Sequence, residues 1–314
     1  MEPETQNWKL TLAYDGTDYK GWQVQPGART VQGELQSALG RILGESPLPQ
    51  GSGRTDAGVH ALAQVASFPL RARIPADNLH RALNGTLPGS IRVTEARIVR
   101  SSFHARHSAE GKTYEYRIFR ARICPPFLSR YVYATRWPMD FEALNLAAQA
   151  FLGTHNFLSF AASDPDMAAR EALSAGETQA ANEGLALREL RAAQEFSQAT
   201  RGTDLMAHEA EFLSAEGKQT GAMRTVFSSQ WEQHTAAEGP LLVYRIRGSG
   251  FLHHMVRNLV GTMLEVGRGR IGPEAIPEIL AARSRSAAGP TAPGRGLFLH
   301  SVDYRAEDEA LDSF

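Results

Sequence analysis

Hydrophobic and polar positions follow two different periods along the first third of the chain. Apolar residues at every second position predict strands at 8–14, 59–68 and 91–99. Apolar residues at helical spacing predict a helix over 31–42, which Thr30 can cap, and Pro75 suits the first turn of a helix to about Leu83. This order of strand, helix, strand, helix, strand places helices on one face of a sheet.

The second part of the chain repeats the same kinds of pattern. It predicts strands at 111–119, 241–247 and 296–304. It also predicts three helices: one capped by Asp140 and ended near Gly153, one over 251–266 stopped by Gly267, and one over 273–283. The chain therefore divides into an N-terminal half, 1–106, and a C-terminal half, 107–305, both of α+β type.

Residues 161–220 depart from these patterns. Fifteen of these 60 residues are alanine, and the segment contains no tryptophan or tyrosine. Its apolar content is too low for a core of its own, although a short helix at 183–196 fits the pattern. We expect a solvated insertion, and we expect the acidic tail at 306–314 to be frayed.

Composition limits the classes of protein to which the chain can belong. The 314 residues leave room for two domains, and the single cysteine, Cys124, excludes an internal disulfide framework or a multi-cysteine metal site. The N-terminal residues lack the apolar core of a signal peptide, and no stretch has the length of apolar residues that crosses a bilayer. These features predict a cytoplasmic protein without a membrane partner.

The charges are distributed unevenly. The formal net charge is −1, but residues 161–220 contain 11 acidic and 5 basic side chains. The remainder holds 28 basic and 23 acidic residues, a net charge of +5, which is compatible with binding phosphates. Since like charges repel, the excess acid of the insertion should not face bound RNA.

The most informative stretch is GSGRTDAGVHALAQVASF at residues 51–68. Its glycines permit a tight, exposed turn that carries Arg54 and Asp56 into a strand. A carboxylate beside a guanidinium stays ionised at neutral pH and is well placed to act as a nucleophile or base. A loop with a surface ion pair would show the same residues, so the spacing alone leaves both interpretations open.

This stretch closely resembles the catalytic motif of the bacterial tRNA pseudouridine synthase A family. Four further stretches agree with the family in the same order: YDGTDYKGWQ at 14–23, FHARHSAEGKTYEYRI at 103–118, GFLHHMVRNLVGTMLEVG at 250–267 and GLFLHSVDY at 296–304. Together they span the chain except for the insertion and the two tails. Five ordered motifs are very unlikely to agree by coincidence.

The resemblance implies a role for each of five residues. Asp56 occupies the position of the essential catalytic aspartate, and Arg257 that of the cation that pairs with it. Arg54 matches the arginine that fills the gap when the target base leaves its stack. Tyr114 matches the tyrosine that stacks on the uracil and is a candidate base at C5, and Leu297 matches an apolar residue of the uracil pocket. Taken without the resemblance, Tyr114 and Leu297 are ordinary core residues of strands.

The resemblance also implies the fold, the partners and the substrate. It implies an α+β fold of two similar ferredoxin-like halves, with a central, mostly antiparallel sheet, helices on one side and an active-site cleft between the halves. The family forms homodimers and acts on uridines 38, 39 and 40 of the tRNA anticodon stem-loop. The isomerisation involves no redox step or group transfer, so we expect no cofactor.

Three other interpretations compete with this one. His60, His253 and His254 suggest a metal site, but zinc sites usually also show cysteines or an HExxH helix, so we expect no metal. An RNA-binding module without catalysis would need only basic and aromatic surface. A glycoside hydrolase would typically have a second acid near Asp56, and none is adjacent in the sequence.

Overall fold

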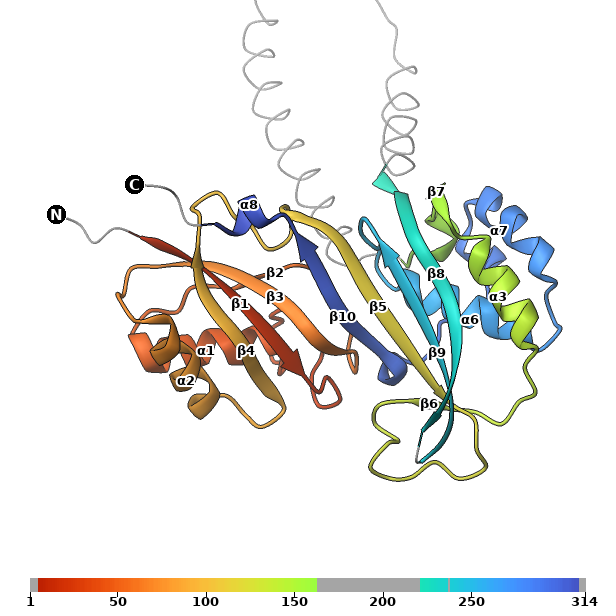
Figure 1. The fold of residues 1–314 in the computed structure, drawn as a ribbon, viewed down its shortest axis with the longest axis horizontal. Helices are drawn as coiled ribbons and strands as arrows, with labels where there is room; N and C mark the ends of the chain where they lie inside the picture. The colour runs from red at the N-terminus through yellow and green to blue at the C-terminus, as the bar shows by residue number, and fades with distance from the viewer. Residues whose placement is uncertain (1–4, 163–220, 237, 311–314) are drawn as a thin grey trace, which may run out of the picture.

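The computed structural model describes residues 5–162, 221–236 and 238–310 (Figure 1). The strands are β1 Gln6–Tyr14, β2 Gln50–Gly51, β3 His60–Leu70, β4 Ile91–Val99, β5 Ala109–Phe119, β6 Tyr133–Ala134, β7 Gly153–Asn156, β8 Met223–Ala236, β9 Gly239–Gly248 and β10 Leu297–Tyr304. The α-helices are α1 Val31–Leu43, α2 Ala76–Thr86, α3 Phe141–Gln149, α6 Met255–Gly267, α7 Ile276–Ala282 and α8 Ala306–Glu309. The helix expected at 183–196 lies outside the described residues.

The described strands form one sheet in the order β4-β1-β3-β10-β5-β9-β8-β7, with β2 and β6 attached to β3 and β5. Neighbours along this order are antiparallel except β3 and β10, which run parallel. The last strand, β10, therefore lies between the strands of the N-terminal half and those of the C-terminal half (Figure 1). The expected division at 106/107 falls between β4 and β5.

One face of the sheet carries the hydrophobic core. Large side chains that are paired across neighbouring strands belong to this face: Trp8, Phe68, Leu297, Tyr116 and Tyr244. Residues of α1, α2, α3 and α6 belong to the same buried cluster, so helices of both halves cover one side of the sheet. The α+β class, the mostly antiparallel sheet and the position of the helices confirm the predicted fold.

The opposite face is polar at its centre. The buried Glu115 on β5 accepts hydrogen bonds from Arg117 at 2.7 Å and from Arg245 at 2.9 Å. An antiparallel sheet with one face on the core and one polar face needs a helical layer on one side only.

The helix ends agree with the predicted caps, with one correction. The Thr30 side chain accepts from the Gly33 amide at 3.3 Å, and the Asp140 side chain accepts from the Ala143 amide at 3.0 Å. The helix expected from residue 251 begins only at Met255, because His254 has a φ of 59° and turns the chain before the helix.

Two further expectations were incomplete or wrong. The strand β8 was not predicted. It has a bulge between Val226 and Ser228, so the buried residue after Val226 is Ser229, three positions later, and the next is Trp231. The bulge therefore interrupts the two-residue period that predicts a strand. The tail was expected to be frayed, but its start forms α8, and the Arg100 amide donates to the carbonyl of Ala310.

Candidate active site

Asp56 lies on the loop of residues 52–59, here called the Asp56 loop, which leads into β3. The buried Gln64 on β3 accepts from the Ser52 hydroxyl at 2.6 Å and donates to the Gly53 carbonyl at 2.9 Å. The hydroxyls of Thr55 and Tyr14 hydrogen bond at 2.8 Å. The loop is therefore fixed on both sides of Arg54 by side chains of β3 and β1.

A second loop, residues 15–30, packs directly against the Asp56 loop. The Trp22 amide donates to the Thr55 carbonyl at 3.0 Å. Gly21 has a φ of +92°, and a Cβ there would lie 2.5 Å from the Thr55 carbonyl oxygen. Only glycine permits both this conformation and this approach, so Gly21 holds the Asp56 loop in place.

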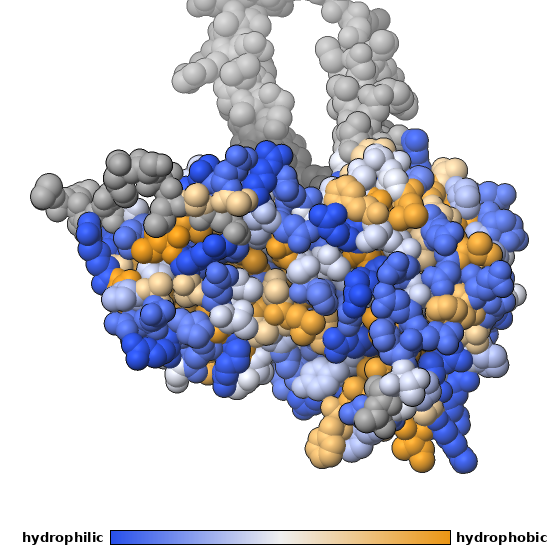
Figure 2. All heavy atoms as spheres, viewed as in Figure 1, coloured by the Kyte–Doolittle hydropathy of each residue, from blue (hydrophilic) through white to orange (hydrophobic). Residues whose placement is uncertain are grey.

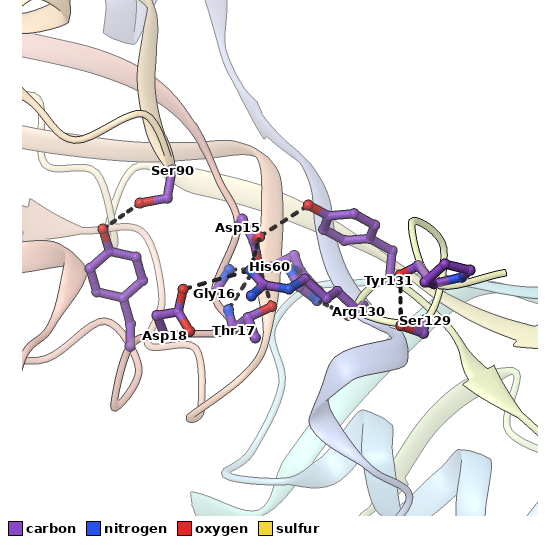
Figure 3. Close-up of polar contacts among 11 residues, drawn as sticks. Asp15, Gly16, Thr17, Asp18, His60, Ser90, Ser129, Arg130 and Tyr131 are labelled. Carbon is purple, nitrogen blue, oxygen red and sulfur yellow. Dashed lines mark hydrogen bonds and ion pairs between the residues drawn. The ribbon is translucent and has the colours of Figure 1, made fainter. Parts of the chain in front are cut away.

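His60 connects the Asp56 loop to the C-terminal half of the chain (Figure 3). Its Nδ1 lies 3.1 Å from the Gly16 amide, and its Nε2 lies 3.0 Å from the Arg130 carbonyl. The Tyr131 hydroxyl donates to Asp15 at 3.0 Å. Burial lowers the pKa of His60 although Asp15 is near, so the imidazole is neutral at neutral pH, with Nε2 as its donor and Nδ1 as its acceptor.

The first turn of α6 and the two residues before this helix bring three side chains to the Asp56 carboxylate. Arg257 donates from Nη1 to Asp56 Oδ2 at 2.9 Å, and its Nε donates to the Ala292 carbonyl at 2.8 Å. His253 Nε2 lies 3.5 Å from Asp56 Oδ1, and His254 Nε2 lies 3.3 Å from Oδ2. The structure thus brings Asp56 and Arg257 together, as the resemblance implies.

The two histidines at this carboxylate were not assigned to the site from the sequence. His254 adopts its left-handed conformation immediately before α6, and this turn precedes the first helical residue, Met255. Burial lowers the pKa of His254, with Asp56 acting in the opposite direction. The sequence did carry a signal, because the helix expected from residue 251 would have placed residues three and four positions before Arg257 on the same side as Arg257.

Asp56, His253 and His254 each offer one ligand atom, and these atoms lie within 4.8 Å of one another. Such a set has the donor types that Zn²⁺ binds. However, the Arg257 guanidinium already occupies Asp56 Oδ2 and would repel a cation there. The arrangement favours a carboxylate held by an arginine, and the absence of a metal remains a prediction.

Tyr114 and Leu297 lie on the helix-covered face of the sheet, and Tyr114 is near enough to Asp56 to feel its charge. The Tyr114 ring contacts Phe251 edge to face, with centroids 5.1 Å apart. Burial raises the pKa of Tyr114, and the charges of Tyr14 and Asp56 add to the rise, so the phenol is protonated at neutral pH. Leu297 begins β10 opposite Tyr116 and is 5% exposed.

Arg54 has an exposed side chain on the Asp56 loop, two positions before Asp56. The loop leaves Arg54 exposed while the neighbouring Thr55 is buried. An exposed cation on a fixed turn can reach a large ligand without unfolding the turn. The position is therefore compatible with the role that the resemblance implies.

Comparison with known proteins gives one consistent result. The family model described as tRNA pseudouridine synthase matches residues 11–108 and 207–305. The chain is 43% identical over 296 residues to tRNA pseudouridine synthase A of Solibacter usitatus, covering 94% of this chain and 98% of the relative. It is 41% identical to the protein of the same name from Moorella thermoacetica, with the same coverage, and 39% identical to that of Halalkalibacterium halodurans, covering 92% and 89%.

Proposed function

The chain belongs to the tRNA pseudouridine synthase family, and we propose that it converts uridines 38, 39 and 40 of the tRNA anticodon stem-loop with Asp56 as its essential catalytic residue. As a member of this family it is an isomerase that acts on uridine in tRNA. The observation that best supports the role of Asp56 is its hydrogen bond from Arg257, which orients a partly buried carboxylate.

The reaction makes few demands on the protein. The bond between N1 and C1′ breaks, the uracil turns, C5 bonds to C1′, and the C5 proton leaves. Nothing is oxidised or transferred to another molecule, so no cofactor is expected. The Asp56 carboxylate can attack the sugar, attack the base, or assist the departure of uracil, and all three routes require the orientation that Arg257 provides.

Extrusion of the target base precedes this chemistry. Unstacking and unpairing a base costs a few kcal/mol. The exposed Arg54 guanidinium can stack in the gap and bind a phosphate with the same planar group. Its place on the Asp56 loop couples the base that leaves the stack to the carboxylate that acts on it.

Tyr114 and Leu297 are proposed to form the uracil pocket. Their strand neighbours on the same face are buried, which gives an apolar floor beside Asp56. Tyr114 offers a ring for stacking, worth roughly 1–3 kcal/mol per base. Because its phenol is protonated at neutral pH, stacking is the role that the structure supports best, and proton acceptance at C5 is the second candidate.

The test is release of tritium from tRNA transcripts labelled at uridine C5. Wild type and Asp56→Asn are assayed in parallel, and pseudouridine is then mapped in the product. Release by wild type alone, with pseudouridine at 38, 39 and 40, is the expected result. Release by the variant at the wild-type rate would remove Asp56 from the mechanism. Wild-type release with pseudouridine mapped at other positions would contradict the proposal that the enzyme modifies uridines 38, 39 and 40.

We further propose a cytoplasmic homodimer, in which one tRNA contacts both subunits. Phe127 is 92% exposed and Ile123 is 79% exposed on the loop between β5 and β6, and Figure 2 shows hydrophobic side chains at the lower tip of the molecule, where Figure 1 places this loop. Exposed apolar residues of this kind favour contact with another chain.

None of the helices in the described part of the chain has the length and apolar character of a membrane span. Light scattering on the purified protein tests the dimer, and Phe127→Asp should shift it toward monomer.

A further inference from the structure

Lys112 lies beside the Asp56 loop in a position that the proposed chemistry does not use. It is on β5, two residues before Tyr114 and therefore on the same side of the strand. Its Nζ donates a hydrogen bond to the Ser52 carbonyl. A Cβ on Gly53 would lie 3.2 Å from Lys112 Nζ and 4.0 Å from the Tyr114 hydroxyl, so the ammonium and the phenol flank the same glycine.

Two arginines lie near this ammonium. Burial lowers the pKa of Lys112 to about 8, and the positive charges of Arg106 and Arg224 contribute to the shift. Burial also lowers the pKa of Arg224, and the positive charge of Arg106 lowers it further. The Arg224 side chain lies over Gly250, where a Cβ would be 3.8 Å from its Nε. The next residue, Phe251, contacts Tyr114, so Lys112 and Arg224 both adjoin the proposed uracil pocket.

Lys112 and the two arginines differ from other basic residues of the sheet, which pair with carboxylates. On the opposite face Arg117 and Arg245 pair with Glu115, and Arg247 pairs with Asp303. Within the described part of the chain, Arg106, Lys112 and Arg224 make no ion pair. Lys112 donates to the Ser52 carbonyl, and Arg224 donates to the carbonyls of Gly221 and Met223. Among the described residues no acid pairs with these three like charges, so they repel one another, and a bound anion removes that cost.

We propose that Arg106, Lys112 and Arg224 bind a phosphate of the RNA backbone next to the target uridine. The inference rests on the proposed function, which supplies the RNA. Arginine forms bidentate hydrogen bonds with phosphate, and lysine binds it as a point charge. Because residue 53 is glycine, it carries no Cβ into the position that lies 3.2 Å from Lys112 Nζ. The phosphate would fix the sugar of the target nucleotide while the base moves from N1 to C5 attachment.

The test compares Arg106→Gln, Arg224→Gln and the double variant with wild type and with Arg73→Gln. Arg73 is exposed and follows the end of β3 that is remote from the Asp56 loop, so it serves as a control for the loss of one positive charge. Binding of a tRNA transcript with uridines at 38, 39 and 40 is measured over a range of salt concentrations. Tritium release gives kcat and KM for each variant.

Each single variant should raise KM about tenfold with kcat within about twofold, because a hydrogen bond from a charged group is lost from binding and not from chemistry. Each should also reduce the slope of log K against log salt by about 0.7–0.9, the value for one neutralised phosphate. An unchanged slope and KM, tighter binding of tRNA, or a fall in kcat alone would overturn the proposal.

Failure of the proposed function is distinguishable from failure of this site. Wild type that binds the transcript without releasing tritium would refute the proposed function. In that case the salt dependence of tRNA binding by the arginine variants would still test whether these cations bind a phosphate. Wild type that releases tritium while both variants match the Arg73→Gln control would refute the phosphate site alone.

Discussion

Arg257 donates a hydrogen bond to Asp56 across 201 positions of the sequence, over an Nη1 to Oδ2 distance of 2.9 Å. Both side chains are largely buried, at 18% exposure for Asp56 and 16% for Arg257. The arginine is itself oriented by a bond from Nε to the Ala292 carbonyl. A carboxylate from the N-terminal half and a cation from the C-terminal half thus make one site, which requires the two halves to be correctly packed.

Arg257→Gln should lower kcat by roughly 100-fold or more, because one oriented charged donor is lost from the reacting carboxylate. Arg257→Lys keeps the charge but cannot make the two hydrogen bonds with one planar group, so it should recover only part of the activity. Single-turnover tritium release with saturating tRNA measures the effect. Full activity in Arg257→Gln would show that Asp56 needs no cation.

Arg54→Lys should impair activity although the charge is kept, because lysine stacks poorly in the gap left by an extruded base. We expect kcat/KM on folded tRNA to fall about 10- to 100-fold, the range of one lost base-stacking contact. The loss should be smaller on an RNA whose target uridine is already unpaired, since extrusion then costs less. Equal activity of Arg54→Lys and wild type on folded tRNA would remove the stacking role, and Arg73→Lys is the matched control.

Tyr114→Phe separates stacking from proton transfer. The variant keeps the ring and removes the hydroxyl, so it should retain activity within about fivefold of wild type if Tyr114 only stacks on the uracil. Tyr114→Ala should lose about 10- to 100-fold. General acid or base catalysis contributes typically 10²- to 10⁴-fold, so a loss of that size in Tyr114→Phe would assign the C5 proton to this hydroxyl.

The period of apolar residues was sufficient to predict most of the fold, because it reflects the burial of one face of each element. Thr30 and Asp140 mark their helix starts through side-chain bonds that are local in sequence. The period of apolar residues failed to predict features that depend on contacts between segments distant in the sequence. The bulge that hides β8 is defined only against β9, and the left-handed His254 occurs where the chain turns toward Asp56.

The site was less accessible to sequence reasoning than the fold. Gly53, Arg54 and Asp56 form a local motif, but no rule of spacing pairs Asp56 with a residue 201 positions away, and only the family resemblance indicated Arg257. His253 and His254 were not assigned to the site, because the sequence alone does not show that the chain turns them onto the carboxylate. Lys112 gave no signal, since its partner is a backbone carbonyl.

His60 predicts how stability depends on pH. Burial makes the pKa of His60 lower in the folded state than the ordinary value of 6.5, so the unfolded chain takes up the proton first as pH falls. The stabilisation is complete above pH 6.5 and is lost below it, by at most about 1.4 kcal/mol per pH unit for one proton. Protonation of Nδ1 would also remove the acceptor of the Gly16 amide.

Thermal melts between pH 5 and 7.5 should therefore show a midpoint that falls with acid in wild type. His60→Gln should be less stable at pH 7.5 but should show a flatter profile below pH 6.5. The matched control is His155→Gln. His155 lies on the edge strand β7, and its ring is hydrogen bonded to the Leu152 carbonyl. This variant should keep the wild-type dependence of the melting midpoint on pH. Identical slopes in all three proteins would show that His60 does not titrate with unfolding.

Gly21 and Gly27 provide a matched pair on one loop. Gly21 has a φ of +92° and Gly27 a φ of +68°, so alanine at either position enters the left-handed region and costs roughly 1–2 kcal/mol. At Gly27 a Cβ would meet nothing within 4 Å, whereas at Gly21 it would lie 2.5 Å from the Thr55 carbonyl oxygen. Only Gly21→Ala must therefore displace the Asp56 loop.

We expect Gly27→Ala to lower the free energy of unfolding by about 1–2 kcal/mol and to leave kcat within about twofold of wild type. Gly21→Ala should cost about 3 kcal/mol or more and should also lower kcat at least tenfold, because Asp56 follows Thr55 and moves with it. Urea unfolding and tritium release measure the two effects. If both variants lost the same stability and kept the same kcat, the contact between Gly21 and Thr55 would have no part in holding the carboxylate against Arg257.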